Sequence, residues 1–238
     1  MKRQPQQFPA EDGGGAPSPA DAEAVLQIKV WLIGLSPMVW RRVLVPAAFT
    51  LRELHGVIQT AMGWEGFHLF QFCLRAIRYG SSELAASSPD VTLAALLLRN
   101  GARFVYEYDL NIPWRHEVRL EGQLAPEAGK TYPICAAGNG ACPPEDCGGP
   151  DAFVAHRDDI LSLDSRDDLA TMAEIIGDIT RHRRAEILDD AEIRWRLERA
   201  IERSQARERA QGKAFSRRTV NVRLGEGAHR ELMHQQSW

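Results

Sequence analysis

Residues 102–122, ARFVYEYDLNIPWRHEVRLEG, carry the clearest strand pattern in the chain. On both sides of a break at residues 111–113, apolar or aromatic side chains alternate with mostly charged ones. A period of two is typical of strands that bury one face and leave the other in water. The pattern therefore predicts two strands joined by a turn, with His116 on the apolar face beside Trp114.

Two further strands are predicted upstream, at residues 25–33 (VLQIKVWLI) and 39–46 (VWRRVLVP). The short Gly-Leu-Ser-Pro segment between them, residues 34–37, favours an antiparallel hairpin. The second strand contains a Trp-Arg-Arg run at residues 40–42, which resembles an anion site. The alternative is that these arginines only line a solvated strand face.

A helix is predicted at residues 51–62, where apolar side chains recur at helical spacing. Thr50 and Glu53 have the spacing of a capping box, in which each side chain bonds the backbone N–H of the other residue. Gly63 is typical of a helix C-terminus. Such a helix would present one apolar stripe to a sheet.

The remaining patterns complete one domain and its extensions. The period of two returns at residues 68–76, and residues 92–101 (TLAALLLRNG) predict a short helix. Together with the elements above, they predict an α+β domain over about residues 24–165. Helical stripes predict a helical extension at residues 166–205, and the end of the apolar stripe predicts a loose tail at residues 206–238.

Residues 1–23 are rich in Gln, Pro, Gly and Ala and show no periodicity, so we expect a disordered arm there. The sequence shows no apolar segment typical of a signal peptide or a membrane span. We therefore expect a cytoplasmic protein, in which clustered cysteines are either free thiols or metal ligands. The formal net charge of -3 argues against a protein that attracts polyanions with its whole surface.

Residues 135–149, CAAGNGACPPEDCGG, contain three of the four cysteines among glycines and prolines that exclude a regular helix or a central strand. Zinc takes about four ligands, and a wrapped loop of this kind could supply three thiolates, from Cys135, Cys142 and Cys147. The alternative is that the cysteines are small buried side chains packed against the sheet.

The fourth ligand of such a zinc site would be His116 from the adjacent strand, His156 or His68, and His116 completes the predicted set. An open position on the same metal, with Glu145 as the base, would make a metal-dependent hydrolase centred on the loop and His116. No HExxH, P-loop, GxGxxG or GxSxG motif accompanies these residues. A non-enzymatic function is therefore favoured.

A basic run in the predicted helical extension, formed by Arg181, Arg183 and Arg184, is the other candidate site. Arginines on one face of a helix can contact the phosphates of nucleic acid. A partner protein could use the same helix, and the interspersed acidic residues also fit a helix that is simply solvated.

Several motifs occur in a fixed order along the chain: VWRRVLVP, TLRELHGVIQTAMGW, HLFQF, FVYEYDL with WRHEV, and YPICAAGNGACPPEDCGGPDAF. In this order they resemble the plasmid pRiA4b ORF-3-like proteins, a family found on plasmids, mobile elements and bacterial chromosomes. The resemblance spans about residues 26–163. It implies an α+β domain with a mixed or mainly antiparallel sheet packed by two or three helices, and it implies no established activity.

One turn departs from the family pattern. Where the family typically reads Tyr-Asp-Phe-Gly-Asp, residues 108–113 of this chain read Tyr-Asp-Leu-Asn-Ile-Pro, so the second carboxylate of that turn is absent.

From the sequence and the resemblance together, we expect a cytoplasmic binding or accessory protein of plasmid or mobile-element origin, without enzymatic activity. Its expected partner is nucleic acid or a protein, and zinc is its only expected cofactor.

Overall fold

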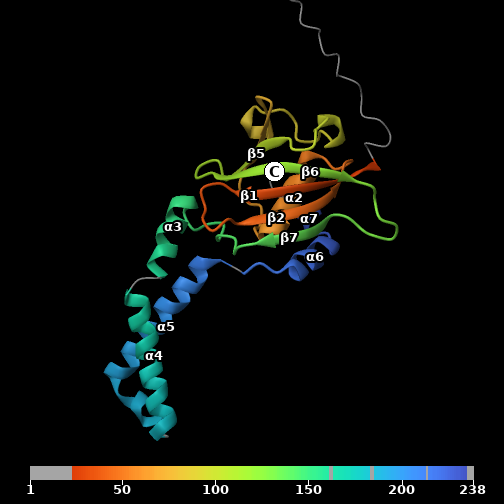
Figure 1. Ribbon diagram of the computed structural model, residues 1–238. Coiled ribbons are helices and arrows are strands. Elements are labelled where there is room, and N and C mark those ends of the chain that lie inside the picture. Colours follow the sequence, from red (N-terminus) through yellow and green to blue (C-terminus); the bar gives the residue numbers. More distant parts are fainter. Residues whose placement is uncertain (1–22, 161–162, 183–184, 213, 235–238) are drawn as a thin grey trace, which may run out of the picture.

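The computed structural model describes residues 23–160, 163–182, 185–212 and 214–234 (Figure 1). Residues 1–22 of the predicted disordered arm lie outside this part of the chain. The main feature is a seven-stranded sheet. In spatial order its strands are β4 (Ile77–Gly80), β3 (Phe70–Leu74), β5 (Arg103–Tyr108), β6 (Trp114–Leu124), β1 (Val25–Leu32), β2 (Trp40–Pro46) and β7 (Ile134–Asn139).

Every pair of neighbouring strands in this sheet is antiparallel, which confirms the predicted α+β class with a mainly antiparallel sheet. The β1–β2 and β5–β6 hairpins form where the alternating patterns predict them. The alternation of apolar and charged residues in the sequence corresponds to an alternation of buried and more exposed side chains. In β5 and β6 the aromatic and apolar side chains, with His116 among them, lie in the core, and most of the charged side chains are on the outer face of the sheet.

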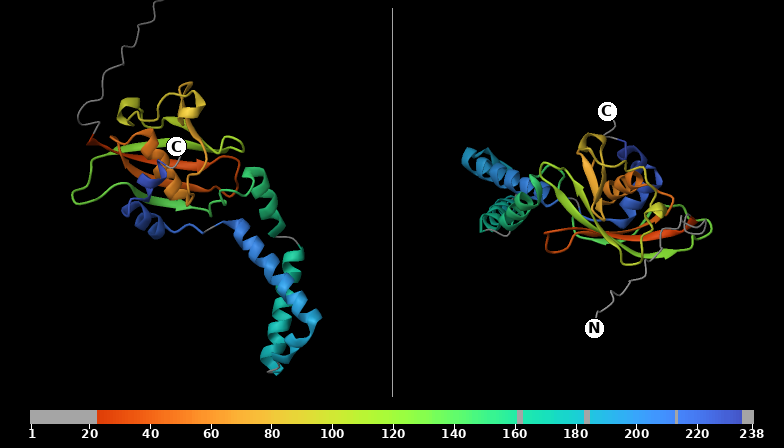
Figure 2. Two further views of the ribbon diagram at one scale, coloured as in Figure 1. Left: turned by 180° about the vertical axis from the view of Figure 1, so that it is seen from behind. Right: turned by 90° about the horizontal axis from the view of Figure 1, so that it is seen from above.

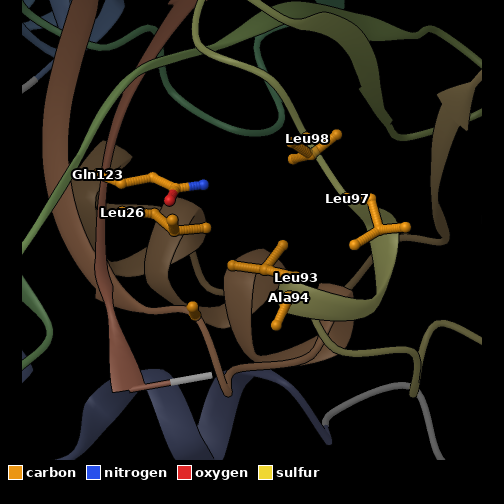
Figure 3. Close-up of a pocket in the computed structure, with 7 residues that line it drawn as sticks. Leu26, Leu93, Ala94, Leu97, Leu98 and Gln123 are labelled. Carbon is orange, nitrogen blue, oxygen red and sulfur yellow. The ribbon is translucent and has the colours of Figure 1, made fainter. Parts of the chain in front are cut away.

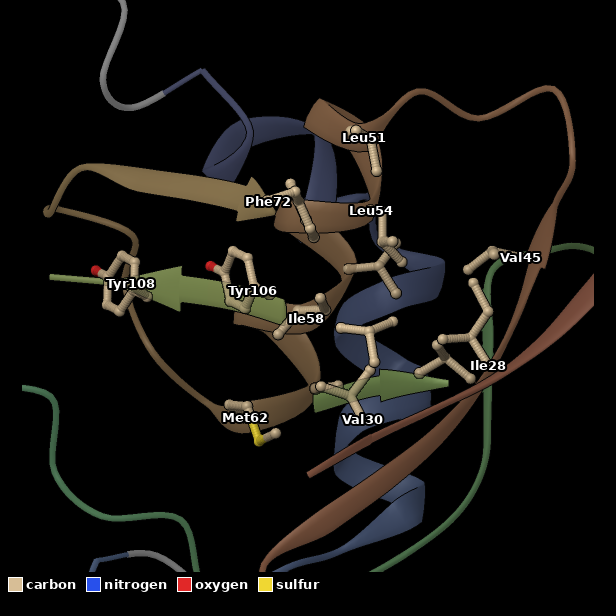
Figure 4. Close-up of a cluster of buried hydrophobic side chains, with 14 of the residues drawn as sticks. Ile28, Val30, Val45, Leu51, Leu54, Ile58, Met62, Phe72, Tyr106 and Tyr108 are labelled. Carbon is tan, nitrogen blue, oxygen red and sulfur yellow. The ribbon is translucent and has the colours of Figure 1, made fainter. Parts of the chain in front are cut away.

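Helix α2 (Leu51–Met62) lies inside the curve of the sheet and begins with the predicted capping box between Thr50 and Glu53. Ten of its twelve residues are buried, more than one apolar stripe would bury. Figure 4 shows Leu54 and Ile58 between strand side chains that include Tyr106 and Val30. The helix is therefore covered by the sheet on one side and by other elements on the other.

Helices α6 (Arg217–Gly225) and α7 (Ala228–Leu232) cover the other side of α2, as Figure 2 shows. The prediction of a loose tail at residues 206–238 is therefore wrong for the described residues. The tail holds only a few apolar side chains among many charged ones, and Val220, Leu224 and Leu232 are nevertheless buried. Tertiary contact with α2 orders a segment that has no apolar stripe of its own.

The prediction of a short helix at residues 92–101 is also wrong, because the structure has only a 3-10 turn at Ala94–Leu96. Leu97 follows in the left-handed conformation, with φ of 46°, and so ends the turn. Leu93, Leu96 and Leu98 are still buried, so this leucine-rich segment covers the core without a regular helix.

A two-helix arm projects from the domain, formed by α4 (Leu163–His182) and α5 (Ala191–Gln211) (Figure 1). Helix α3 (Gly149–Ile160) leads into this arm from the end of the cysteine-containing residues 135–149. The carboxylate of Asp168 on α4, which is almost fully buried, forms salt bridges with Arg203 and Arg207 on α5. None of the helices in the described ranges is long and apolar enough to cross a membrane.

Candidate functional site

Residues 142–147 lie over one end of the aromatic core, and we call this segment the cysteine cover, or the cover. The indole N–H of Trp64, after α2, donates a hydrogen bond to the carbonyl oxygen of Pro143 at 2.8 Å. The indole N–H of Trp114, at the start of β6, donates to the carbonyl oxygen of Glu145 at 3.3 Å. Both tryptophans are buried, so the loop carbonyls satisfy indole groups that would otherwise lack partners. The cysteine segment is thus a fixed cover.

The carboxylate of Glu145 fixes the same cover from its other side. It accepts hydrogen bonds from the backbone N–H groups of Glu65 at 2.7 Å and Phe67 at 3.4 Å, and from the hydroxyl of Tyr108. Burial and this hydrogen bond raise the pKa of Tyr108, so the phenol stays protonated and donates. A carboxylate with three donors anchors a loop, and this geometry does not support the hypothesis that Glu145 is the base of a hydrolase.

Of the three thiols of the predicted zinc site, one lies on β7 and two lie in the cover. Cys135 is fully buried on the edge strand β7, Cys142 is buried in the cover, and Cys147 is partly exposed. Burial raises the pKa of all three thiols, and raises that of Cys142 to about 12. The burial of Cys135 and Cys142 fits the alternative in which the cysteines pack as small apolar side chains.

His116, the predicted fourth ligand, lies in the core between the rings of Trp64 and Tyr106, with centroids 5.4 and 5.1 Å away. Its Nδ1 lies 3.0 Å from the carbonyl oxygen of Trp114, and burial lowers the pKa of the imidazole to about 3. Nε2 has no hydrogen-bond partner among the described atoms. In the described part of the chain, no three His, Cys, Asp or Glu side chains are placed to hold a metal ion. Zinc binding stays a prediction without support from this geometry.

The two other candidate zinc ligands, His68 and His156, lie close to the cover, but in the described part of the chain neither completes a group of three potential metal ligands. His68 Nε2 lies 3.1 Å from a carboxylate oxygen of Asp146 and Nδ1 lies 4.0 Å from one of Asp109, which links β3 to the cover. His156 is exposed on α3 and lines a groove of about 1600 Å³. The groove runs between the cover, the turn at residues 62–67 and the end of α5.

A second, smaller cavity of about 210 Å³ lies at the other side of the domain (Figure 3). Its lining is almost entirely apolar and consists of Leu26, Ala47, Leu93, Ala94, Leu97, Leu98 and Gln123. Among these lining residues there is no titratable group, and Gln123 is the one polar side chain.

Arg41, in the Trp-Arg-Arg run, is buried rather than solvated, with an exposed fraction of 2%. Its guanidinium donates to the carbonyl oxygens of Ala61, Trp40 and Asn139 at 2.8–2.9 Å, and Phe215 lies 4.2 Å from it. Burial lowers its pKa. Arg41 therefore ties α2, β2, β7 and the tail together, and only its neighbours Trp40 and Arg42 face outward.

The predicted arginine site is only partly described. Arg181 is exposed near the end of α4, and Arg183 and Arg184 lie outside the described residues. On α5, Arg203 and Arg207 pair with Asp168, and Arg196 lies 3.7 Å from Glu174. Much of the positive charge on the arm is therefore neutralised within the arm.

A row of four cations crosses the outer face of the sheet. Its members are successive register partners on β2, β1, β6 and β5: Arg42, Lys29, Arg119 and Arg103. Since neighbouring strands lie about 4.8 Å apart, this cation row is about 14 Å long. Sequence reasoning missed it, because each member occupies an ordinary polar position of its strand and only the register aligns them.

The two residues at the ends of the cation row form salt bridges, and the two in its middle form none with a described residue. Arg42 forms a salt bridge with Glu121 at 2.5 Å, and Arg103 forms one with Glu117 at 3.0 Å. Within the described ranges, neither Lys29 nor Arg119 forms a salt bridge. Like charges directly opposite one another destabilise a sheet.

Two tryptophans lie beside the cation row on the same face. Trp31 and Trp40 are register partners on β1 and β2, and both are partly exposed. The ammonium of Lys29 lies 5.5 Å from the ring centre of Trp31 and 4.9 Å from that of Trp40, and the guanidinium of Arg42 lies 5.4 Å from Trp40. Figure 2 shows that α2, α6 and α7 lie on the opposite side of the sheet.

Known proteins resemble this chain in sequence and fold. The uncharacterised protein y4hQ of Sinorhizobium fredii (strain NBRC 101917 / NGR234) is 38% identical over 133 residues, which are 53% of this chain and 68% of y4hQ. The crystal structure of MM3350, a protein of unknown function from Methanosarcina mazei Go1, matches with 30% identity and a TM-score of 0.54. That match covers 61% of this chain and 86% of MM3350.

The family match agrees with the motifs, the sheet and its cysteine cover. Residues 24–187 match the family described as plasmid pRiA4b ORF-3-like protein, and this span includes all seven strands, α2 and the cover. The chain belongs to the plasmid pRiA4b ORF-3-like family.

Proposed function

We propose that this protein binds single-stranded nucleic acid on the outer face of its sheet. The observation that carries the proposal is the cation row, in which Lys29 and Arg119 lie opposite one another and neither forms a salt bridge in the described structure. A polyanion laid across the strands would relieve this repulsion, because its phosphates would alternate with the four cations. The row runs across four strands, so it suits an extended chain.

The neighbouring tryptophans favour nucleic acid over an acidic peptide. Aromatic side chains on an open sheet face stack with unpaired bases, and the adjacent cations hold the backbone. Trp31 and Trp40 lie side by side, so they offer a surface for one or two bases next to the phosphates. A duplex, whose bases are already stacked, gains nothing from these rings.

The sheet face also suits this role better than the arm does. Arg196, Arg203 and Arg207 already have carboxylate partners on α4, so binding phosphate there would first require breaking salt bridges. On the outer face, Lys29 and Arg119 are available without that cost. The formal net charge of -3 means that attraction is local and falls quickly with salt.

The test measures binding of a labelled single strand of about 12 nucleotides by fluorescence anisotropy, at salt concentrations between about 50 and 200 mM. Each phosphate contact adds about 0.7 to the slope of log K against log salt. The double variant Lys29→Gln with Arg119→Gln should therefore reduce the slope by about 1.4. A control variant with Arg181, Arg183 and Arg184 changed to Gln should bind like the wild type.

A second pair of variants tests stacking. Trp31→Ala and Trp40→Ala should each weaken binding of the single strand about 5- to 150-fold, because stacking contributes about 1–3 kcal/mol per base. Binding to a duplex of the same sequence should change little. If the wild type binds no single strand at low salt, or if only the arm variant loses binding, the sheet face is not the site.

A further inference from the structure

The two-helix arm buries its apolar side chains only along the contact between α4 and α5. Ile175 on α4 and Ala200 on α5 are buried there, with exposed fractions of 5% and 0%. The salt bridges of Asp168 with Arg203 and Arg207 lie on the same line. Helix α3 and the 3-10 helix at Ala185–Asp189 also contact α5, and apart from these contacts the two broad sides of the helix pair are uncovered in the described part of the chain.

One of these two sides carries three exposed apolar side chains among charged ones. Leu169 and Ile176 on α4 have exposed fractions of 59% and 55%, and Ile201 on α5 has one of 36%. Leu169 and Ile176 each follow a buried α4 residue by one position, and Ile201 follows Ala200 in the same way. In an antiparallel pair of right-handed helices, this offset turns both sets of side chains to the same side. We call it the apolar side of the arm.

We propose that the apolar side of the arm binds the same side of a second copy of this chain, so that two arms form a four-helix bundle. Exposed apolar patches of this kind mark contact surfaces, and a two-fold dimer pairs one patch with itself. The domain lies at one end of the arm, so most of the length of α4 and α5 projects away from it (Figure 1).

The charges of the two helices select one arrangement of the copies. Helix α4 contains five acidic and two basic residues, whereas α5 contains six arginines and four glutamates. Two-fold packing can place α4 over the other copy's α4 or over its α5. Opposite net charges favour α4 over α5, which also brings Leu169 of one copy opposite Ile201 of the other.

The area of the contact is sufficient for a dimer. Helix α4 has 20 residues, so it is about 30 Å long, and two adjacent helices are about 20 Å wide. One side of the arm therefore offers about 600 Å² per copy, or about 1,200 Å² in all. This value is at the lower end of the range for specific interfaces.

Sedimentation equilibrium of the full chain tests the proposal. The wild type should be a dimer at micromolar concentration, and the double variant Leu169→Glu with Ile176→Glu should raise the dimer Kd at least about 100-fold, because it places unpaired charges in the contact. Both positions are exposed within one copy, so circular dichroism should show unchanged helix content. The matched control Val222→Glu, at an exposed position of α6, should remain a dimer.

Crosslinking then tests the arrangement. When a Leu169→Cys variant is mixed with an Ile201→Cys variant, a disulfide between the two copies should form, and the same variants alone should give less of it. A monomeric wild type, whether or not another protein or a nucleic acid binds the arm, overturns the proposal. A dimer that survives Leu169→Glu with Ile176→Glu overturns it as well.

Discussion

The hydroxyl of Tyr106 lies 2.7 Å from Nδ1 of His55, deep between α2 and β5, and Gln59 donates to the same hydroxyl at 2.7 Å. The ring of His55 lies parallel to that of Phe70, with centroids 3.8 Å apart. These polar groups lie inside an aromatic core where water does not reach them. Their ionisation should therefore control how the fold responds to acid.

Acid should unfold the protein through His55 and His116. Burial lowers the pKa of each to about 3, against 6.5 for an ordinary histidine, so below pH 6.5 the unfolded chain binds two protons that the folded chain does not. Stability should fall as pH decreases from about 6.5 towards 3, by about 1.4 kcal/mol per pH unit for each histidine. Urea unfolding at pH 7, 6 and 5 measures this slope.

His55→Gln or His116→Gln should each reduce that slope by about one proton, although both will lower stability at pH 7. The control His156→Gln changes an exposed side chain and should leave the slope unchanged. A slope that is the same in all three variants would show that other groups cause the acid sensitivity.

The cysteine cover should open when one indole donor is removed. Trp64→Phe keeps an aromatic ring, although a smaller one, and leaves the carbonyl oxygen of Pro143 without its partner, at a cost of about 1–3 kcal/mol. We expect Cys142, which is buried within this cover, to react faster with a thiol reagent. Mass spectrometry after timed labelling identifies the cysteine.

The control for this change is Trp195→Phe on the arm, where the indole is 59% exposed and Cys142 should keep its wild-type rate. An unchanged rate in Trp64→Phe would mean that the hydrogen bond does not hold the cover closed.

A methyl group at Gly56 should detach the tail. A Cβ atom there would lie 2.0 Å from the backbone oxygen of His229, and a backbone cannot move aside as a long side chain can. Gly56→Ala should destabilise the fold by about 1–3 kcal/mol and make α7 sensitive to protease. Gly225→Ala, at the end of α6 with no atom within 4 Å, should instead leave stability within about 1 kcal/mol of the wild type. Equal effects would exclude close packing as the cause.

Relieving the repulsion in the cation row should stabilise the sheet. Arg119 is exposed and lies between Lys29 and Arg103 in the register, so Arg119→Gln should raise the free energy of unfolding by about 0.2–1 kcal/mol at low salt. The gain should shrink at about 1 M salt, where charges are screened. The control Arg78→Gln changes an exposed arginine whose register partner is Cys73, and it should give no such gain. Destabilisation by Arg119→Gln would contradict this account.

Local signals in the sequence predicted the local structure well. Thr50 and Glu53 are three positions apart, so their capping box could be seen without knowing the fold, and the strands of the β1–β2 hairpin are joined by a short turn. The family motifs added the fold class.

The cation row, the ordered tail and the burial of Arg41 could not be predicted, because they depend on contacts between distant parts of the chain. Lys29 and Arg119 become neighbours only through the β1–β6 register, which a β-bulge after Gln27 shifts. Helix α7 is ordered by its contact with Gly56, and its own sequence carries too few apolar residues to predict a helix. The burial of Arg41 likewise follows from three carbonyl groups that lie on α2, β2 and β7.

The position of α6 and α7 over α2 has a consequence for synthesis. During translation all seven strands and α2 leave the ribosome before residues 217–232, so the apolar groups that α6 and α7 cover stay open to water until these residues have emerged. The nascent domain therefore completes its core only after α6 and α7 have been made. Until then it is exposed to aggregation and to chaperones, even though the sheet itself can already form.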